Sequence, residues 1–232
     1  MEHKSRPLLD LLLGIVIPSA ILMNFSEPEK LGATWSLILA LAFPLSRGLY
    51  ELVRFRVRNY IALLGFVSVL LTGGIGLLQM DTQWLAIKEA AVPALLGFAV
   101  AISAWIGRPL VRVLLYNPQL LNTDKIDRSL DAGGQAETFE ARLLNATYLL
   151  SATFFFSAVM NYLLASWIVV SPAGSAAFNE ELGRLTLISY PVIALPSMAM
   201  MLLILFFIWR AIRDLTGLGF DEILAPSLVA DR

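Results

Sequence analysis

Two adjacent charged residues, Lys88 and Glu89, lie in an otherwise apolar stretch, and their position suggests chemistry. A charge costs roughly 2.5–3.5 kcal/mol at the centre of a bilayer. The cost falls near the bilayer edge, where lysine can extend its ammonium toward water. Neighbouring side chains on a helix point about 100° apart. We therefore expect the two groups not to meet each other directly.

Two interpretations of this pair remain open. In the first, Lys88 is an interfacial anchor, and Trp84 one turn earlier offers its ring to the ammonium. In the second, at least one member is buried against an opposite charge on a substrate or proton path. The anchor is favoured for Lys88, whereas Glu89 is expected to face the bundle because its shorter stem reaches less far toward water. The candidate partners on the same side are Asp81, Glu180, Glu181 and Arg184.

Asn161 is a further candidate, because it lies deep in another apolar stretch and its amide must find a partner. A hydrogen bond to a neighbouring helix is one interpretation. Contact with a substrate or a water path is the other. Asn161 therefore joins Lys88, Glu89 and Asp81 as a candidate functional residue.

Small residues recur at helical spacing in two apolar stretches, 59–78 and 85–106. Small side chains let the backbones of membrane helices approach closely. We therefore expect these two helices to pack tightly, within the chain or across a dimer. The residues of this packing face are Gly65, Ser68, Thr72 and Gly76 in the first stretch and Gly97 in the second.

Prolines interrupt several of the apolar stretches. Each proline removes one amide hydrogen bond and leaves a carbonyl group one turn earlier without its partner. A bilayer tolerates this only where another helix, a hydroxyl group or water satisfies that carbonyl. Such helix breaks are typical of transporters, and they also occur as ordinary kinks in proteins that transport nothing. The expected breaks are at Pro18, Pro93, Pro191 and Pro196.

The elements that position these residues are apolar segments. Of the 232 residues, 58% are hydrophobic and 15% are charged, which is too apolar for a soluble domain of this size. A spanning helix needs about 20 predominantly apolar residues. We therefore predict an all-α polytopic membrane helix bundle, a single integral membrane domain over 1–232, with six transmembrane helices in antiparallel hairpins. The predicted spans are 8–25, 31–50, 59–78, 85–106, 143–170 and 185–209.

The distribution of Lys and Arg predicts the orientation. Of the 17 such residues, fourteen fall on one side of the six predicted spans, and that side is then cytoplasmic. Both termini and the long loop 107–142 are therefore expected in the cytoplasm, as in a multi-pass protein of the bacterial inner membrane. Within the loop, residues 122–134 are expected to form a short helix that begins at Asn122 or Thr123 and is ended by Gly133 and Gly134.

Composition also limits the chemistry. The chain has no cysteine, a single histidine and a net charge of −1. These counts exclude disulfides and thiolate sites, and they leave no basic footprint for nucleic acid. Clusters of acidic, histidine or cysteine residues typical of membrane enzymes are missing from the sequence. We therefore expect no enzyme, no cofactor and no metal, and the expected partners are the lipid bilayer and either a second copy or another envelope membrane protein.

Three groups of residues form a pattern between positions 73 and 112: Gly73, Gly74 and Gly76, then Asp81, Trp84 and Lys88, then Gly107, Arg108, Pro109 and Leu110. Together they resemble the bacterial intracellular septation protein A family, and they look closer still to a related uncharacterised inner-membrane family. The chain departs from the septation family at Glu89, where that family tends to have proline, and its long loop and last two spans fit that family poorly.

Two functions follow as expectations. The broken helices, the Lys88–Glu89 pair and Asn161 favour a small carrier or permease of unknown substrate. The resemblance and the small-residue faces favour a non-catalytic, septation-associated envelope scaffold that acts through lateral protein contacts. A water-accessible cavity that reaches Lys88 or Asn161 would favour the carrier, and a dry, packed bundle would favour the scaffold.

Overall fold

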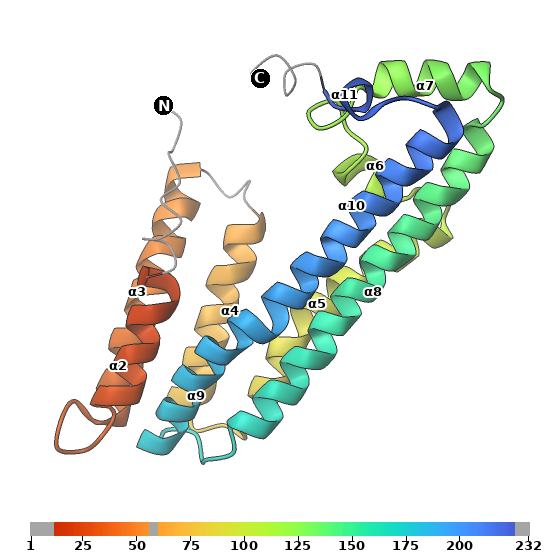
Figure 1. Cartoon of the computed structure of the whole chain (residues 1–232). Helices are drawn as coiled ribbons and strands as arrows, with labels where there is room; N and C mark the ends of the chain where they lie inside the picture. The colour runs from red at the N-terminus through yellow and green to blue at the C-terminus, as the bar shows by residue number, and fades with distance from the viewer. Residues whose placement is uncertain (1–11, 56–59, 226–232) are drawn as a thin grey trace. The chain divides into compact units, whose positions relative to one another are not determined.

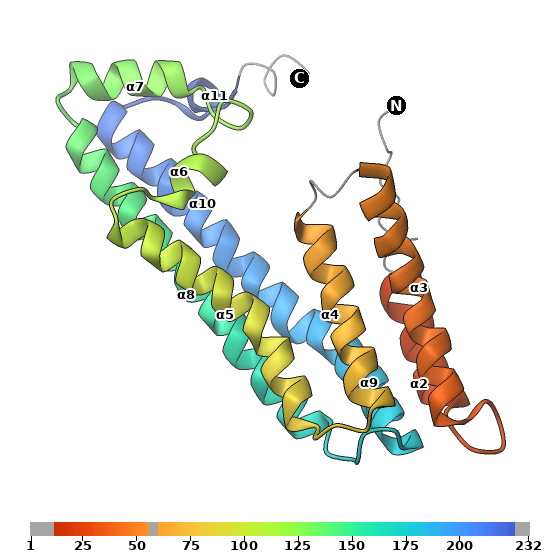
Figure 2. The same cartoon turned by 180° about the vertical axis from the view of Figure 1, so that it is seen from behind.

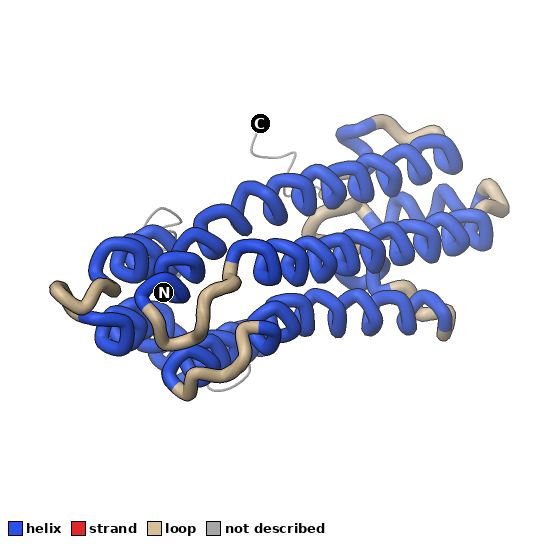
Figure 3. The backbone as a smooth tube through the Cα atoms, turned by 90° about the horizontal axis from the view of Figure 1, so that it is seen from below, coloured by secondary structure: helices blue, strands red, loops and turns tan. Residues whose placement is uncertain are grey.

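The computed structural model describes residues 12–55 and 60–225, which form helices without strands (Figure 3). One isolated β-bridge joins Leu121 to Leu224. The predicted all-α class is therefore confirmed. The elements, labelled in Figure 1, are η1 (Leu12–Val16), α2 (Ile17–Phe25), α3 (Gly32–Phe55), α4 (Tyr60–Leu77), α5 (Gln83–Trp105), α6 (Leu110–Leu114), α7 (Thr123–Ala132), α8 (Ala136–Ile168), α9 (Ala176–Ser189), η2 (Tyr190–Ala194), α10 (Leu195–Thr216) and α11 (Phe220–Ile223).

Each of the six predicted spans contains helix, but the helices differ in length. Among the described residues, four helical stretches are long and apolar enough to cross a membrane, and two shorter ones are apolar. The apolar helices indicate a membrane protein, whereas the count of six spans stays a prediction. The start of the first predicted span lies outside the described residues. The four long stretches are Gly32–Tyr50, Gln83–Trp105, Ala136–Ile168 and Ala176–Thr216, and the shorter ones are Gly14–Phe25 and Gly65–Leu77.

The prolines alter the helices without ending them. Helix α5 continues through Pro93. Pro191 lies in the π-helical turn η2, and Pro196 follows in the first turn of α10, so that α9, η2 and α10 form one continuous helical run. Pro18 lies in the first turn of α2, directly after the π-helical segment η1. The breaks expected at these prolines are therefore local changes of geometry, because a wider turn can absorb a missing amide hydrogen bond.

The chain groups into two compact units, and α5 and α8 each contribute to both. The first unit contains residues up to 91 together with 159–194, and the second contains 92–158 together with the residues from 195 onward. Figure 2 shows the same helices from behind. Each unit has its own cluster of buried apolar side chains. The candidate polar residues of the sequence all belong to the first unit.

The first unit is built around α2, α3, α4 and α9. Leu37 of α3, Leu85 of α5 and Phe178 of α9 are almost completely buried in its core. Helix α9 begins where the Ser175 hydroxyl accepts a hydrogen bond from the Phe178 amide at 3.0 Å. This cap fixes where α9 begins. Asn179, which follows Phe178, is then buried inside the first unit.

The second unit ends in a small cluster of short helices. Helix α7 begins after Asn122, whose side chain accepts a hydrogen bond from the Lys125 amide, and ends at Gly133. The capped helix predicted from the loop is therefore confirmed. Its apolar face packs on α10 and α11, and the Lys125 ammonium pairs with Glu222 of α11 at 2.8 Å. Gly107, with φ +72°, provides the left-handed turn between α5 and α6.

Candidate functional site

Helix α5 places Lys88 and Glu89 in its second turn. The start of α5 is supported by Asp81, whose Oδ1 accepts a hydrogen bond from the Gln83 amide at 2.8 Å. This is the local turn bond that aspartate commonly makes two residues ahead of itself. Asp81 is exposed and is not a partner of Lys88, so its observed role is to help begin the helix.

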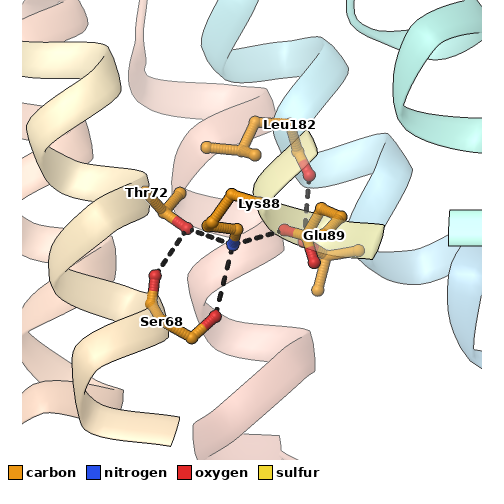
Figure 4. Close-up of polar contacts among 6 residues, drawn as sticks. Ser68, Thr72, Lys88, Glu89 and Leu182 are labelled. Carbon is orange, nitrogen blue, oxygen red and sulfur yellow. Dashed lines mark hydrogen bonds and ion pairs between the residues drawn. The ribbon is translucent and has the colours of Figure 1, made fainter. Parts of the chain in front are cut away.

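The ammonium of Lys88 makes three hydrogen bonds, one for each of its protons (Figure 4). It donates to Glu89 Oε1 at 2.6 Å, to Thr72 Oγ1 at 2.8 Å and to Ser68 Oγ at 3.3 Å. Both hydroxyl groups come from α4, so the ammonium links α5 to α4. These four residues, Ser68, Thr72, Lys88 and Glu89, are called the lysine cluster below.

The lysine cluster contradicts the expectation that the two charges do not meet. The 100° between neighbouring positions sets the directions in which the side chains leave the helix. The several rotatable bonds of lysine and glutamate still allow the charged ends to converge. The favoured anchor interpretation of Lys88 is also wrong, because its side chain is only 10% exposed, and that of Glu89 is 29% exposed. The pair is a largely buried ion pair.

The acids and the arginine expected as partners of this pair make other contacts. The Glu181 carboxylate accepts hydrogen bonds from the Val170 and Ser171 amides and from the Ser171 hydroxyl, at 2.7 to 2.9 Å. Glu180 pairs with Arg184 one turn along α9, where both are exposed. Glu181 therefore stabilises the connection between α8 and α9, and Glu180 and Arg184 form an ion pair on the exposed side of α9. Figure 4 also labels Leu182 of α9, whose carbonyl accepts a hydrogen bond from the Thr186 hydroxyl at 2.9 Å.

Asn161 is half-buried on α8 and interacts with at least one other residue. It is not among the partners of the Lys88 ammonium. The structure therefore brings Lys88, Glu89, Ser68 and Thr72 together, whereas Asp81 contacts the Gln83 amide at the start of α5.

The glycines of the expected packing face have different neighbours from those predicted. A β-carbon added at Gly76 would lie 2.5 Å from Leu37 of α3 and 3.2 Å from Phe178 of α9. One added at Gly65 would meet nothing within 4 Å. The close approach at Gly76 is therefore to α3 and α9, whereas Ser68 and Thr72 of the same face contact Lys88 of α5 and Gly65 has open space around it. Tight packing of α4 on α5, within the chain or across a dimer, stays a prediction.

Gly97 of α5 packs in the second unit. A β-carbon there would lie 3.2 Å from a ring carbon of Phe155 and 3.3 Å from Phe154, both on α8. The Ser151 hydroxyl of α8 donates to the Gly97 carbonyl at 2.9 Å. The tight packing of Gly97 was expected, but its partner is α8, because bulky phenylalanine rings fill the space that the missing side chain leaves.

Two residues with a clear structural role escaped sequence reasoning. Asn179 of α9 is fully buried, and its amide donates to Ser26 Oγ at 3.0 Å and to the Ala33 carbonyl at 2.7 Å. A β-carbon on Gly183 would lie 3.0 Å from the Ser19 carbonyl of α2. Both residues precede the predicted sixth span and fall in the predicted connection between the fifth and sixth spans. The Ser175 cap signal could have extended the helix to include them.

The part of the chain that the structure describes contains no group of three or more His, Cys, Asp or Glu that could hold a metal ion. The expectation of no metal or cofactor stays a prediction. Comparison of the chain with protein families, with curated proteins and with solved structures gave no match. The resemblance to the septation family is untested and also stays a prediction.

Proposed function

We propose that the chain is a membrane carrier for a small polar or charged solute and that the lysine cluster takes part in transport. The observation that supports this proposal is the largely buried Lys88–Glu89 pair on an apolar helix. Ionisable residues within apolar membrane helices are rare and are commonly found on ion, proton or substrate paths.

The energetic argument concerns what the pair contributes to folding. Removing two charges from water costs several kcal/mol per ion, and their attraction only partly offsets that cost. Two apolar residues of similar volume are often as stabilising as such a pair. The folding of α4 against α5 therefore does not require these charges, which favours a functional role for them.

The geometry suggests how the cluster would respond to a solute. The Glu89 side chain is more exposed than that of Lys88, so the Glu89 carboxylate is the member of the pair that an entering proton or cation would reach first. Neutralising Glu89 would remove the strongest partner of Lys88. The hydroxyls of Ser68 and Thr72 would continue to hold the ammonium, which could then accept an anionic group of the solute. Under this proposal Lys88 exchanges between the carboxylate and the solute.

The carrier proposal is tested in proteoliposomes. The purified chain is reconstituted, incubated with a mixture of small polar metabolites, and the vesicle contents are measured by mass spectrometry. At least one solute should accumulate above the level in empty vesicles. The variants Lys88→Met and Glu89→Gln should abolish that uptake, whereas Glu180→Gln, which changes an exposed acid of α9, should retain it.

Two outcomes would contradict the carrier proposal. One is a set of vesicle contents indistinguishable from those of empty vesicles. The other is uptake that persists unchanged when both charges of the pair are removed. Thermal melts of every variant in detergent separate a loss of transport from a loss of folding.

The proposed topology has six spans with both termini cytoplasmic, in a bacterial inner membrane. Exposed charged side chains on α7, among them Asp124 and Arg128, support an aqueous position for that helix. Reporter fusions at Thr123 and at the C-terminus should both give a cytoplasmic signal. A periplasmic signal at either position would contradict the topology.

A scaffold that acts through lateral helix contacts is the second candidate. The observation that favours it is Gly65, which is exposed and has open space around its α-carbon. Small residues on an exposed face suit close approach by a helix of a partner protein or of a second copy. Gly65→Leu should then abolish dimerisation or co-purification of a partner without lowering the melting temperature. Unchanged association would remove this support.

A further inference from the structure

A groove of about 570 Å³ runs between α8 and α10 in the second unit. The two helices lie side by side in both Figures 1 and 2. Most of the wall is apolar and is formed by side chains such as Leu149, Leu203 and Phe207. Charged residues of the wall occur only at one end, where α8 begins and α10 ends. These residues are Arg142, Arg210 and Asp214.

The charges at this end are complementary to an anion. Arg210 is exposed and lies 3.5 Å from Asp214 on its own helix, so its charge is partly compensated. Arg142 is exposed and makes no ion pair with any residue in 12–55 or 60–225. Two arginines and one aspartate leave a net positive charge at the end of the groove. Arginine is well suited to phosphate because its planar group presents two parallel donors.

The length of the groove fits a lipid chain in one leaflet. Along α8 the lining extends from Arg142 to Thr153, which is about 16 Å at 1.5 Å per residue. Half of the hydrocarbon thickness of a bilayer is about 15 Å. An acyl chain that begins beside Arg142 would therefore remain within the groove over the depth of one leaflet.

We infer that this groove binds an anionic phospholipid. Its phosphate lies at Arg142 and Arg210, and one acyl chain lies along the apolar wall between α8 and α10. Other occupants fit the groove less well. A soluble phosphate compound would leave the apolar wall uncovered. A zwitterionic lipid such as phosphatidylcholine would bring a phosphate to Arg142, but its cationic choline would offset that charge and be repelled by the two arginines. The inference does not depend on the carrier proposal, because the groove and the lysine cluster lie in different units.

The test measures lipid affinity by native mass spectrometry of the full chain in detergent. Dioleoyl phosphatidylglycerol should bind more tightly than dioleoyl phosphatidylcholine, and soluble glycerol 3-phosphate should not bind. Arg142→Gln should raise the Kd for phosphatidylglycerol about fivefold, since one basic residue near an anionic headgroup contributes about 1 kcal/mol. Arg210→Gln should have a smaller effect because Asp214 already compensates part of that charge.

Two matched controls accompany these variants. Arg213→Gln changes an exposed arginine of the same helix that packs over Trp209 and does not line the groove, and it should leave the Kd unchanged. Ala152→Trp fills the groove and should reduce binding of both lipids. Val159→Trp, at an exposed site of α8 outside the groove lining, should not. Arg210 pairs with Asp214, whereas the other substituted side chains form no ion pair within residues 12–55 and 60–225. All of the substituted side chains are exposed, so folding should be retained.

Several results would overturn the inference. Equal affinity for the two lipids would remove the role of charge. An equal loss of affinity in Arg213→Gln would show nonspecific attraction to the basic end of α10. Binding of glycerol 3-phosphate with the same affinity would assign the site to a free phosphate compound. If Ala152→Trp binds like Val159→Trp, the chain of the lipid does not lie in the groove.

Discussion

Removing the carboxylate of Glu89 should destabilise the protein more than removing the ammonium of Lys88. The Lys88 side chain is 10% exposed, whereas that of Glu89 is 29% exposed. Glu89→Ala leaves a largely buried ammonium with only the hydroxyls of Ser68 and Thr72 as acceptors. Lys88→Met leaves a carboxylate that can turn toward solvent or headgroups, and methionine fills much of the volume of the lysine stem.

The expected magnitudes follow from burial. Breaking a fully buried ion pair costs about 3–5 kcal/mol, and an exposed pair contributes about 0–1 kcal/mol. The Lys88–Glu89 pair lies between these limits, and the two hydroxyls retain part of the hydrogen bonding of the ammonium. We therefore expect losses of about 2–3 kcal/mol for Glu89→Ala and about 1 kcal/mol for Lys88→Met. Glu89→Gln keeps an acceptor and should lose less than Glu89→Ala.

Thermal and denaturant unfolding in detergent micelles measure these losses. The double variant Lys88→Met/Glu89→Leu removes both charges and should lie within about 1 kcal/mol of the parent, because apolar replacement of a buried pair is often neutral. Glu180→Ala serves as the control at an exposed pair and should lie within about 1 kcal/mol of the parent. Equal losses in the two single variants, or a double variant that shows their sum, would refute the reasoning.

Three further predictions concern packing, a buried amide and pH. Gly76→Leu should lose about 1–3 kcal/mol of stability by overpacking. Gly65→Leu places its side chain in open space and should melt like the parent. Equal melting temperatures of the two variants would contradict the close contact at Gly76. Asn179→Ala should lose about 1–3 kcal/mol because the buried Ser26 hydroxyl and the Ala33 carbonyl lose their donor. The exposed amide of Asn24 provides the control, with little loss expected in Asn24→Ala. Burial and a hydrogen bond to a neighbouring carboxylate raise the pKa of Tyr116, which lies outside the predicted spans. The raised pKa means that the folded state keeps a proton that the unfolded state loses above about pH 10, so stability should fall as pH rises above 10. Tyr116→Phe should show a smaller fall in chemical denaturation across that range, and an unchanged pH dependence would count against this assignment.

Much of the helical organisation could be predicted from the sequence, because its signals are local. Apolar runs placed helix in each of the six predicted ranges, and the Asn122 and Gly133 signals predicted the bounds of α7. Those bounds follow from hydrogen bonds to residues a few positions away, which the sequence displays directly. Hydropathy likewise indicates a membrane protein, since a lipid solvent permits so apolar a surface.

The partners of the important side chains were decided only by the tertiary structure. Helical spacing identified Gly76 and Gly97 as sites of close approach, but the neighbours are Leu37 and Phe155 on helices that the spacing does not specify. Asn179 joins α9 to residues about 150 positions earlier, and nothing local marks that pairing. Helical geometry points the β-carbons of Lys88 and Glu89 about 100° apart, which predicts that the two charges do not meet. In the structure the long side chains rotate so that the charged ends meet, and the α4 hydroxyls of Ser68 and Thr72 hold the ammonium there. Such contacts depend on which helix faces pack against each other, and the type and spacing of residues within one helix do not determine that.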